Sequence, residues 1–200
     1  MLIKRVRCRV TDRDAFSRGQ QAWGALTGQP GFLGQCGGWS TREPGIAYVF
    51  AWWSSAGDHS AFLAGPHDDI AAAHKGTYDE IDVRLFDREL TIGAGPGDGS
   101  VVRLAHCHVL PGREEHFAAA QAEVWNPGMV AAPGMNGGLF GRDGQEFLVL
   151  TWWRTAGDHA RYQEETFPAL REASLAADDL GAITGDVVAL EPSWAVPPAV

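Results

Sequence analysis

The sequence predicts an α+β fold in which one small unit occurs twice along the chain. The clearest sign is a repeat: WWSSAGDH at residues 52–59 returns as WWRTAGDH at residues 152–159, an offset of 100 in a chain of 200 residues. A second sign is that both halves show the same succession of two-residue and 3.6-residue hydrophobic periods, which mark strands and helices. Self-similarity at half the chain length indicates an internal duplication.

The first half is predicted to fold in the order β-α-β-β-α-β. Apolar and basic residues alternate at its start, which is typical of a strand. Glu43, Pro44 and Gly45 form a predicted turn between two β-rich segments. The predicted elements are strand 2–10, helix 12–26, strands 32–40 and 46–53, helix 56–74 with a break near 65–66, and strand 81–86.

The second half repeats this order, with strands expected near residues 101–110, 135–142, 146–153 and 185–190. Between the halves, residues 93–99 (GAGPGDG) have the glycine-rich composition of a linker. We therefore divide the chain into two homologous halves, residues 1–92 and residues 100–192.

The predicted order is that of the split βαβ, or ferredoxin-like, fold. In such a unit two helices cover one face of a four-stranded sheet, and the other face needs a cover of its own. A second copy can supply it, so we expect the two sheets to form a barrel of the dimeric α+β type within one chain. On this prediction the protein is a monomer with an internal pseudo-dimer, or it pairs further as a homodimer.

Composition and charge narrow the classes of function. With 16 Lys and Arg against 25 Asp and Glu, the formal net charge is −9, which argues against a nucleic-acid partner or an anionic membrane surface. The longest apolar run is far shorter than the roughly 20 residues of a membrane helix. Three cysteines without a CxxC pair, and charges that interrupt the N-terminal segment, predict a cytoplasmic protein without disulfides.

Strand alternation also predicts which side chains can form a functional site. Val6, Cys8 and Val10 form one row of the first strand and are expected to face the helices. In the second half, Ala105, Cys107 and Val109 form the matching row. The opposite rows, which a closed barrel turns to its interior, carry basic and imidazole side chains: Arg5, Arg7, Arg9, His106 and His108.

These rows define a candidate pocket for an anionic or phenolate-like small molecule, because guanidinium and imidazole groups bind such anions. Arg7 and Arg9, with Arg84 of the last strand, are the candidate ligand-binding residues. His106 and His108 are the candidate catalytic residues, because a neutral imidazole can accept a proton near pH 7. The alternative is that the rows meet solvent or are neutralised by nearby carboxylates.

Neither a metal nor a cofactor is predicted. Two histidines at i and i+2 share a strand face, but a metal site needs three or four ligands, and no third has a recognisable spacing. The glycines fit no phosphate-binding pattern of the GxGxxG or P-loop kind.

The repeated Trp-Trp dipeptides allow two interpretations. Neighbouring strand residues point to opposite faces, so one Trp of each pair faces the helices and the other faces the interior. Core packing of all four rings explains the dipeptides without any function. In the alternative, one ring from each half lines the pocket and stacks on an aromatic ligand, with Trp52 and Trp152 as its walls.

The repeated Asp-His pair has a structural explanation. Residues 55–58 and 155–158 both match the Ser/Thr-x-x-Asp/Glu capping box of a helix N-terminus. His59 and His159 then follow on the first turn of each helix, where they can be exposed.

His67 and His74 occur in the first half only. They lie seven positions apart, or two helical turns, so one helix face can carry both. In a duplicated protein such an asymmetric pair can mark a site retained in one half, and both are candidate ligand-binding residues. The alternative is a pair that is satisfied within the fold or solvated.

Motifs spread along the first half carry a family resemblance. They are the start of the first strand through Cys8, PGFLGQ at residues 30–35, GGW at residues 37–39, HDDI at residues 67–70 and the dipeptide Thr77-Tyr78. These motifs resemble the YdbC-like family of monooxygenase-like proteins over nearly all of residues 2–90. The second half is less similar, since FPAL at residues 167–170 replaces HDDI.

The resemblance implies a place in the antibiotic-biosynthesis monooxygenase superfamily, whose fold is the dimeric α+β barrel. It implies an oxidoreductase that acts on a small anionic or aromatic molecule without nicotinamide, flavin or metal. The superfamily also includes haem-degrading proteins, and for haem His67 or His74 is the candidate axial ligand. A third alternative is a non-catalytic protein that binds a small molecule.

Overall fold

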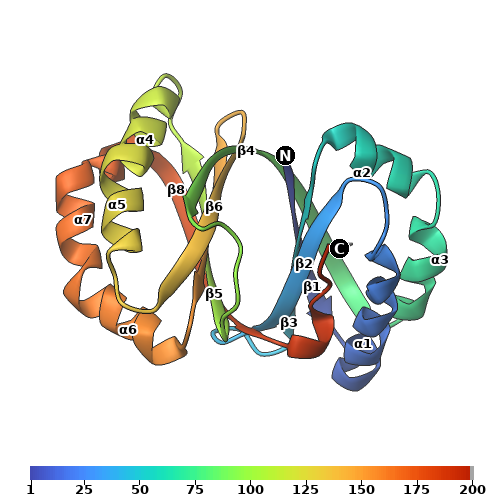
Figure 1. Ribbon diagram of the computed structural model, residues 1–200. Coiled ribbons are helices and arrows are strands. Elements are labelled where there is room, and N and C mark those ends of the chain that lie inside the picture. The colour runs from blue at the N-terminus through green and yellow to red at the C-terminus, as the bar shows by residue number, and fades with distance from the viewer. Residues whose placement is uncertain (199–200) are drawn as a thin grey trace. The chain divides into compact units, whose positions relative to one another are not determined.

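The computed structural model describes residues 1–198 and divides them into two compact units (Figure 1). The first unit comprises Met1–Asp87 together with residues 188–198, and the second comprises Arg88–Val187. Each unit contains an antiparallel sheet with helices packed on one of its faces, as the sequence predicts. Among the described helices, none has the length and hydropathy that a membrane crossing requires.

The first unit follows the predicted order of elements. These are β1 (Leu2–Val10), α1 (Arg13–Gln20), η1 (Gln21–Leu26), β2 (Phe32–Ser40), β3 (Ile46–Trp53), α2 (Ala56–Leu63), α3 (His67–Ala71), η2 (Ala72–His74) and β4 (Tyr78–Gly93), where η1 and η2 are 3-10 helices. β1 lies between β3 and β4, so that Val6 is paired with Val49 on one side and with Val83 on the other. β2 continues the sheet beyond β3.

The second unit repeats these elements. They are β5 (Val101–Val109), α4 (Glu114–Ala120), the π-helical η3 (Gln121–Trp125), α5 (Asn126–Val130), β6 (Met135–Asp143), β7 (Glu146–Trp153), α6 (Ala156–Glu165), α7 (Phe167–Ser174), the 3-10 helix η4 (Ala176–Asp179) and β8 (Leu180–Leu190). Ala105 pairs with Val149, which matches the pairing of Val6 with Val49 in the first unit.

The strand register preserves the duplication in detail. β2 shifts register against β3 between Phe32 and Gly34, and β6 shifts against β7 between Met135 and Gly137. The hydrogen-bonded strand order is β1-β3-β2-β8-β5-β7-β6-β4, which closes on itself as a barrel. The predicted fold class, two ferredoxin-like units in tandem in a dimeric-type α+β barrel, is confirmed.

The last strand of each half is longer than the sequence pattern indicates. β4 runs on to Gly93, although alternation is visible only over residues 81–86. The end of β8 pairs with β2, with Leu190 opposite Gly38, and it belongs to the first unit. The compact units therefore differ from the sequence halves at these strands, because backbone pairing rather than sequence similarity sets their limits.

The short segment after β8 completes the core of the first unit. Trp194, in η5 (Pro192–Trp194), is fully buried, and its ring centroid lies 5.6 Å from that of Phe16 and 5.2 Å from that of Trp39. Backbone hydrogen bonds between Gln35 and Val196 hold the segment beside β2. Sequence patterns do not reveal this packing, because it joins residues from opposite ends of the chain.

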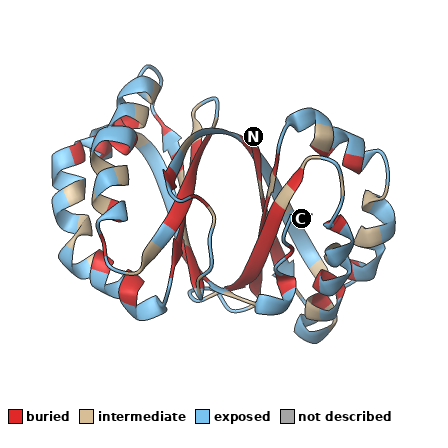
Figure 2. Cartoon of the chain, viewed as in Figure 1, coloured by how far each residue is buried: buried red, intermediate tan, exposed pale blue. Residues whose placement is uncertain are grey.

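The rows of the first strands lie as alternation predicts. Cys8 packs on the helix side against Phe16, with Val6 beside it, and Cys107 packs in the same way against Phe117. Figure 2 shows the helices as exposed on their outer sides, and the buried residues are concentrated in strands such as β3 and β7. The helix-facing row of each first strand is therefore confirmed.

Both repeated Ser/Thr-x-x-Asp motifs cap helices, as predicted. Ser55 Oγ accepts the backbone N–H of Asp58 at 3.1 Å, and Thr155 Oγ1 accepts that of Asp158 at 3.0 Å. These bonds satisfy N–H groups that have no partner inside the helix.

His59 and His159 are buried, although their place on the first turn would allow exposure. Their exposed fractions are 4% and 7%. The first turn of each helix lies on the sheet, and each imidazole meets a tryptophan ring edge-on, Trp53 in the first unit and Trp153 in the second.

Candidate functional site

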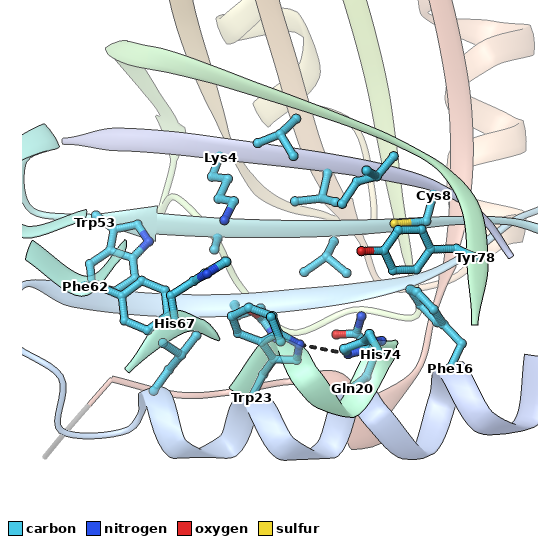
Figure 3. A pocket seen from close by; sticks show the side chains of 18 residues that line it. Lys4, Cys8, Phe16, Gln20, Trp23, Trp53, Phe62, His67, His74 and Tyr78 are labelled. Atoms are coloured by element: carbon cyan, nitrogen blue, oxygen red, sulfur yellow. Dashed lines mark hydrogen bonds between the residues drawn. The ribbon is translucent and has the colours of Figure 1, made fainter. Parts of the chain in front are cut away.

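A cavity of about 210 Å³ lies between the sheet and the helices of the first unit. Figure 3 shows its walls and the few polar groups among them. The larger apolar side chains of its lining include Phe16, Trp23, Trp53 and Phe62. Its polar side chains include Lys4, Gln20, His67, His74 and Tyr78. A concave, mostly apolar site with a few polar groups is the usual form of a small-molecule pocket.

Lys4 is the cation of this pocket. It lies on the same row of β1 as Val6 and Cys8, so its side chain points to the helices. Its ammonium group makes no hydrogen bond or ion pair with any described residue, and burial lowers the Lys4 pKa from the ordinary value. Because a desolvated charge without a partner is costly, this position favours an anionic ligand.

Gln20 adds a free acceptor to the same cavity. Its side chain is buried, and its Oε1 has no hydrogen-bond partner among the described residues. Buried polar atoms are nearly always paired, so this oxygen is available to a ligand hydroxyl. Lys4 and Gln20 together suit a molecule that carries both an anionic oxygen and a hydroxyl group.

His67 offers a nitrogen that can accept a proton. Figure 3 shows its ring at the same end of the pocket as Lys4 and Trp53. Nδ1 of His67 lies 2.8 Å from Oδ1 of Asp68, and since a carboxylate only accepts, Nδ1 carries the hydrogen and Nε2 the lone pair. The ring of Phe62 meets it edge-on at 5.5 Å and fixes its plane. Nε2 makes no hydrogen bond with a described residue.

His59, close to the same two groups, stays neutral. Burial, with smaller contributions from Lys4 and His67, lowers the pKa of His59 to about 4. Its Nε2 is buried without a hydrogen-bond partner among the described residues. At neutral pH His59 therefore adds no positive charge to this end of the pocket.

His74 lines the pocket as a structural group. The indole Nε1–H of Trp23 donates to His74 Nε2 at 2.9 Å, and the imidazole packs against Phe16 with ring centroids 4.8 Å apart. Burial lowers the pKa of His74, so the ring is neutral and its acceptor nitrogen is occupied. The structure brings His67 and His74 to one cavity, but of the two only His67 keeps a nitrogen that can accept a hydrogen bond.

The thiol and the phenol at the other end of the pocket stay protonated. Burial raises the pKa of Cys8 to about 12 and also raises the pKa of Tyr78. A protonated thiol is neither a nucleophile nor a base. Neither Cys8 nor Tyr78 therefore offers a base at neutral pH.

Trp53 lines this pocket, and Trp52 does not. Trp53 packs on the helix side against Phe62, with ring centroids 5.0 Å apart. Trp52 lies on the opposite face, where its ring covers Gly34 so closely that a Cβ there would be 2.6 Å away. Trp152 is the equivalent residue of the second unit and is buried. One Trp of the first pair therefore faces the helices and the other the opposite face, as strand alternation predicts, and a pocket walled by Trp52 and Trp152 on that opposite face stays a prediction.

The arginines on the other row of β1 are paired with carboxylates. Arg7 Nη2 lies 2.8 Å from Glu43 Oε2, and Arg9 Nη2 lies 2.5 Å from Glu80 Oε2. Neither arginine lines the cavity of the first unit. Neutralisation, the alternative that the sequence left open, therefore describes Arg7 and Arg9.

Arg84 belongs to the same network. Its Nε lies 3.2 Å from Oδ1 of Asp82, which also forms an ion pair with Arg5. Burial raises the pKa of Asp82, but the two guanidinium groups lower it further, so the carboxylate is charged. More than half of the Arg84 side chain is exposed, and it too lies outside the cavity.

His106 and His108 share a single carboxylate. Glu146 Oε2 lies 2.8 Å from His106 Nε2, and Glu146 Oε1 lies 2.6 Å from His108 Nδ1. Both imidazoles are thereby held by one side chain of the neighbouring strand β7. Neither lines the cavity of its own unit, so their catalytic role stays a prediction.

Solved structures of the same fold cover nearly the whole chain. A proposed monooxygenase from Lactobacillus acidophilus matches with a TM-score of 0.77 and 16% identity, over 98% of this chain and 95% of that protein. An anthrone oxidase-like protein matches with a TM-score of 0.67 and 14% identity, over 95% and 91%. A haem-degrading enzyme from Listeria monocytogenes matches with a TM-score of 0.55 and 9% identity, over 94% and 97%. These likenesses place the chain in the fold class of the antibiotic-biosynthesis monooxygenases.

Sequence comparison identifies the family within this class. Residues 2–86 match DUF4937, a domain of unknown function. The uncharacterized protein YdbC of Bacillus subtilis (strain 168) is 30% identical over 95 residues, which cover 44% of this chain and 80% of YdbC. The chain belongs to the YdbC family. The matched domain contains every residue that lines the pocket of the first unit.

The pocket of the first unit does not fit haem. Its volume of about 210 Å³ lies below the roughly 300–1,000 Å³ of pockets for drug-sized ligands, and a porphyrin is larger than most such ligands. His74, one of the two predicted axial ligands, already accepts a hydrogen bond at Nε2. The cavity suits a flat molecule that is smaller than a porphyrin.

Proposed function

We propose that the protein is a cofactor-independent oxygenase of a small phenolic or otherwise anionic aromatic molecule, which binds in the pocket of the first unit. The observation that carries the proposal is the unpaired ammonium group of Lys4 in an otherwise aromatic and aliphatic cavity. The charge favours a phenolate or enolate oxygen beside Lys4, and the aromatic walls favour a flat ring.

Lys4, His67 and Gln20 each have a role in this reaction. His67 Nε2 removes a proton from an activated carbon of the substrate, and Asp68 holds the imidazole in the tautomer that can accept it. Lys4 stabilises the negative charge that develops on the enolate oxygen, as a preorganised cation does in a water-poor site. Gln20 Oε1 accepts a hydrogen bond from a second hydroxyl group and orients the ring.

The oxidation needs no reductant other than the substrate. The enolate gives one electron to O₂, and the two radicals combine to a peroxide at the carbon that lost its proton. His67 returns the proton as the O–O bond breaks, and the peroxide loses water to leave a carbonyl group. For an activated CH₂ group the balance is R₂CH₂ + O₂ → R₂C=O + H₂O.

Oxygen uptake with 1,8-dihydroxyanthrone tests the proposal, since this molecule has an acidic CH₂ group between phenolic rings. The likeness to an anthrone oxidase-like protein supports this choice of substrate. We expect one O₂ to be consumed per quinone formed, at a rate above that of the spontaneous reaction. Lys4→Met is expected to lower kcat by about a hundredfold, the usual effect of removing one group that stabilises a developing oxyanion.

Lys75→Met is the matched control, because Lys75 is exposed and lies outside the pocket. His67→Phe introduces the residue found at the matching position 167 and should abolish turnover while the ring still binds. Equal rates in Lys4→Met and Lys75→Met, or no uptake above the spontaneous rate, would contradict the proposal. Binding of the anthrone without oxygen uptake would instead support the non-catalytic alternative.

A further inference from the structure

The second unit has its own cavity, of about 460 Å³, at the position that matches the pocket of the first unit. It is lined by Phe117, Trp125 and Cys107, at the positions that match Phe16, Trp23 and Cys8 of the first pocket. Its volume falls within the roughly 300–1,000 Å³ of typical ligand pockets. The duplication has therefore produced two cavities, and the larger lies outside the residues 2–86 that the family domain covers.

The polar groups of this cavity differ from those of the first. Arg103 takes the place of Lys4, while Phe167 replaces His67 and Arg171 replaces Ala71. No histidine, aspartate or glutamate is among the described residues that line it. The second cavity thus holds two cations and lacks a base, which favours binding rather than proton transfer.

The two guanidinium groups are placed to bind an anion. Arg103 lies over the ring of Phe167, with 5.9 Å between Cζ and the ring centroid, so it enters the aromatic part of the cavity. Arg171 is exposed at the rim and forms no hydrogen bond or ion pair through its guanidinium group with any described residue. Arginine pairs with carboxylates through two parallel N–H donors, which makes it selective for a planar acid.

A buried hydroxyl group lies near Arg103. Tyr162 is 2% exposed, and its hydroxyl has no hydrogen-bond partner among the described residues. Burial raises the pKa of Tyr162 to about 12, with Arg103 opposing the shift, so the hydroxyl remains a donor at neutral pH. Tyr162 does not line the cavity, so this hydroxyl adds a buried donor near Arg103 and is not a proposed ligand contact.

The local backbone also distinguishes this cavity. Gln121 and Trp125 lie in the π-helical segment η3, whereas the matching segment η1 of the first unit is a 3-10 helix. The wider π turn changes the direction of these side chains, and such turns are frequent at functional sites. Gln121 is fixed by a 2.7 Å hydrogen bond from its Nε2 to Asn126 Oδ1.

We propose that the second unit binds an amphipathic carboxylate, with its ring system against the packed pair of Trp125 and Phe167 and its acid group on Arg103 and Arg171. The site is a second ligand site, chemically distinct from that of the first unit and without catalytic function. It does not depend on the oxygenase activity proposed for the first unit.

Binding of 2-naphthoate to the full chain, followed by NMR of ¹³C-methyl methionine, tests this proposal. The chain has three methionines, and of these Met129 lines the cavity. We expect a ring-current shift of the Met129 methyl signal that saturates with 2-naphthoate. The uncharged ester methyl 2-naphthoate should bind at least about tenfold more weakly, because hydrogen bonds to charged groups contribute more than neutral ones.

Arg171→Ala introduces the residue found at position 71 of the first unit, and it should weaken 2-naphthoate binding about tenfold. Arg161→Ala is the matched control, since Arg161 is exposed on α6 and pairs with Asp158 outside the cavity. Lys4→Met should leave the Met129 titration unchanged, which separates this site from the first. An unshifted Met129 signal, equal affinities for acid and ester, or equal affinities of Arg171→Ala and Arg161→Ala would overturn the proposal.

Discussion

The indole N–H of Trp23 donates a 2.9 Å hydrogen bond to Nε2 of His74 and so ties η1 to η2 across the helical wall of the first pocket. The same imidazole packs against Phe16 and lies so close to Gly19 that a Cβ there would be 3.0 Å from its ring. This arrangement gives a histidine that the sequence marked as a ligand-binding candidate a role in holding the pocket open.

Replacement of His74 by Leu should lower the free energy of unfolding by about 1–3 kcal/mol, because it removes the acceptor of a partly buried indole and an aromatic contact. Urea denaturation monitored by circular dichroism measures this loss. The double-mutant cycle with Trp23→Phe should give a coupling energy of about 1 kcal/mol. Strictly additive losses would show that the hydrogen bond contributes nothing.

The lowered pKa of His59 predicts that the stability of the protein depends on pH. Its pKa is about 4 in the folded protein and about 6.5 in an unfolded chain, so between these values the unfolded state binds more protons. The free energy of unfolding should therefore fall as the pH drops from 6.5 towards 4, by up to about 1.4 kcal/mol per pH unit from this residue. His59→Phe, which keeps a ring against Trp53, should remove that slope.

Denaturation curves of the wild type and His59→Phe, recorded between pH 4 and pH 9, test this expectation. Above pH 7 the difference between the two proteins should be constant, which serves as the internal control. A difference that stays constant down to pH 4 would mean that His59 titrates normally in the folded state.

The capping bond at Thr155 makes a third prediction. Thr155→Ala leaves the backbone N–H of Asp158 without its acceptor and should cost about 1 kcal/mol of stability. Thr166→Ala is the control, because Thr166 precedes α7 without a capping hydrogen bond from its side chain. Thermal or urea denaturation that gives equal losses for the two variants would contradict the capping role.

Much of the fold follows from the sequence, because its signals are local or repeated. Alternation in β1 fixes which row faces the helices, and the repeated motif at residues 52–59 and 152–159 fixes the duplication. The role of Trp194 could not be predicted, since nothing in its neighbours indicates that it packs beside Phe16.

The candidate site was predicted less well, for a physical reason. Arg7 and Arg9 form the more visible charged row, but carboxylates on other strands neutralise them, and such pairing depends on tertiary register. The sequence does indicate the pocket at Lys4, because this charged residue lies on the same row as Val6 and Cys8, which face the helices. A cation on a buried row indicates a pocket better than a cation on an exposed one.

The dipeptide Pro-Gly at residues 30–31 returns at residues 133–134, and the side chain of Asp158 explains the second glycine. Gly134 has a φ of +85°, and a Cβ added there would lie 2.4 Å from Asp158 Cγ; Gly31 and Asp58 form the same pair in the first unit. Gly134→Ala should therefore suffer both backbone strain and a collision with Asp158, whose backbone N–H donates to the α6 cap residue Thr155.

Gly144→Ala separates these two effects. Gly144 also has a positive φ, of +60°, but nothing lies within 4 Å of an added Cβ. Its substitution should cost only the strain of about 1–2 kcal/mol that a left-handed conformation imposes on alanine. Gly134→Ala should cost clearly more, since Asp158 must move and weaken its bond to Thr155. If urea denaturation gives the same loss for both variants, contact with Asp158 is not the reason for glycine at this position.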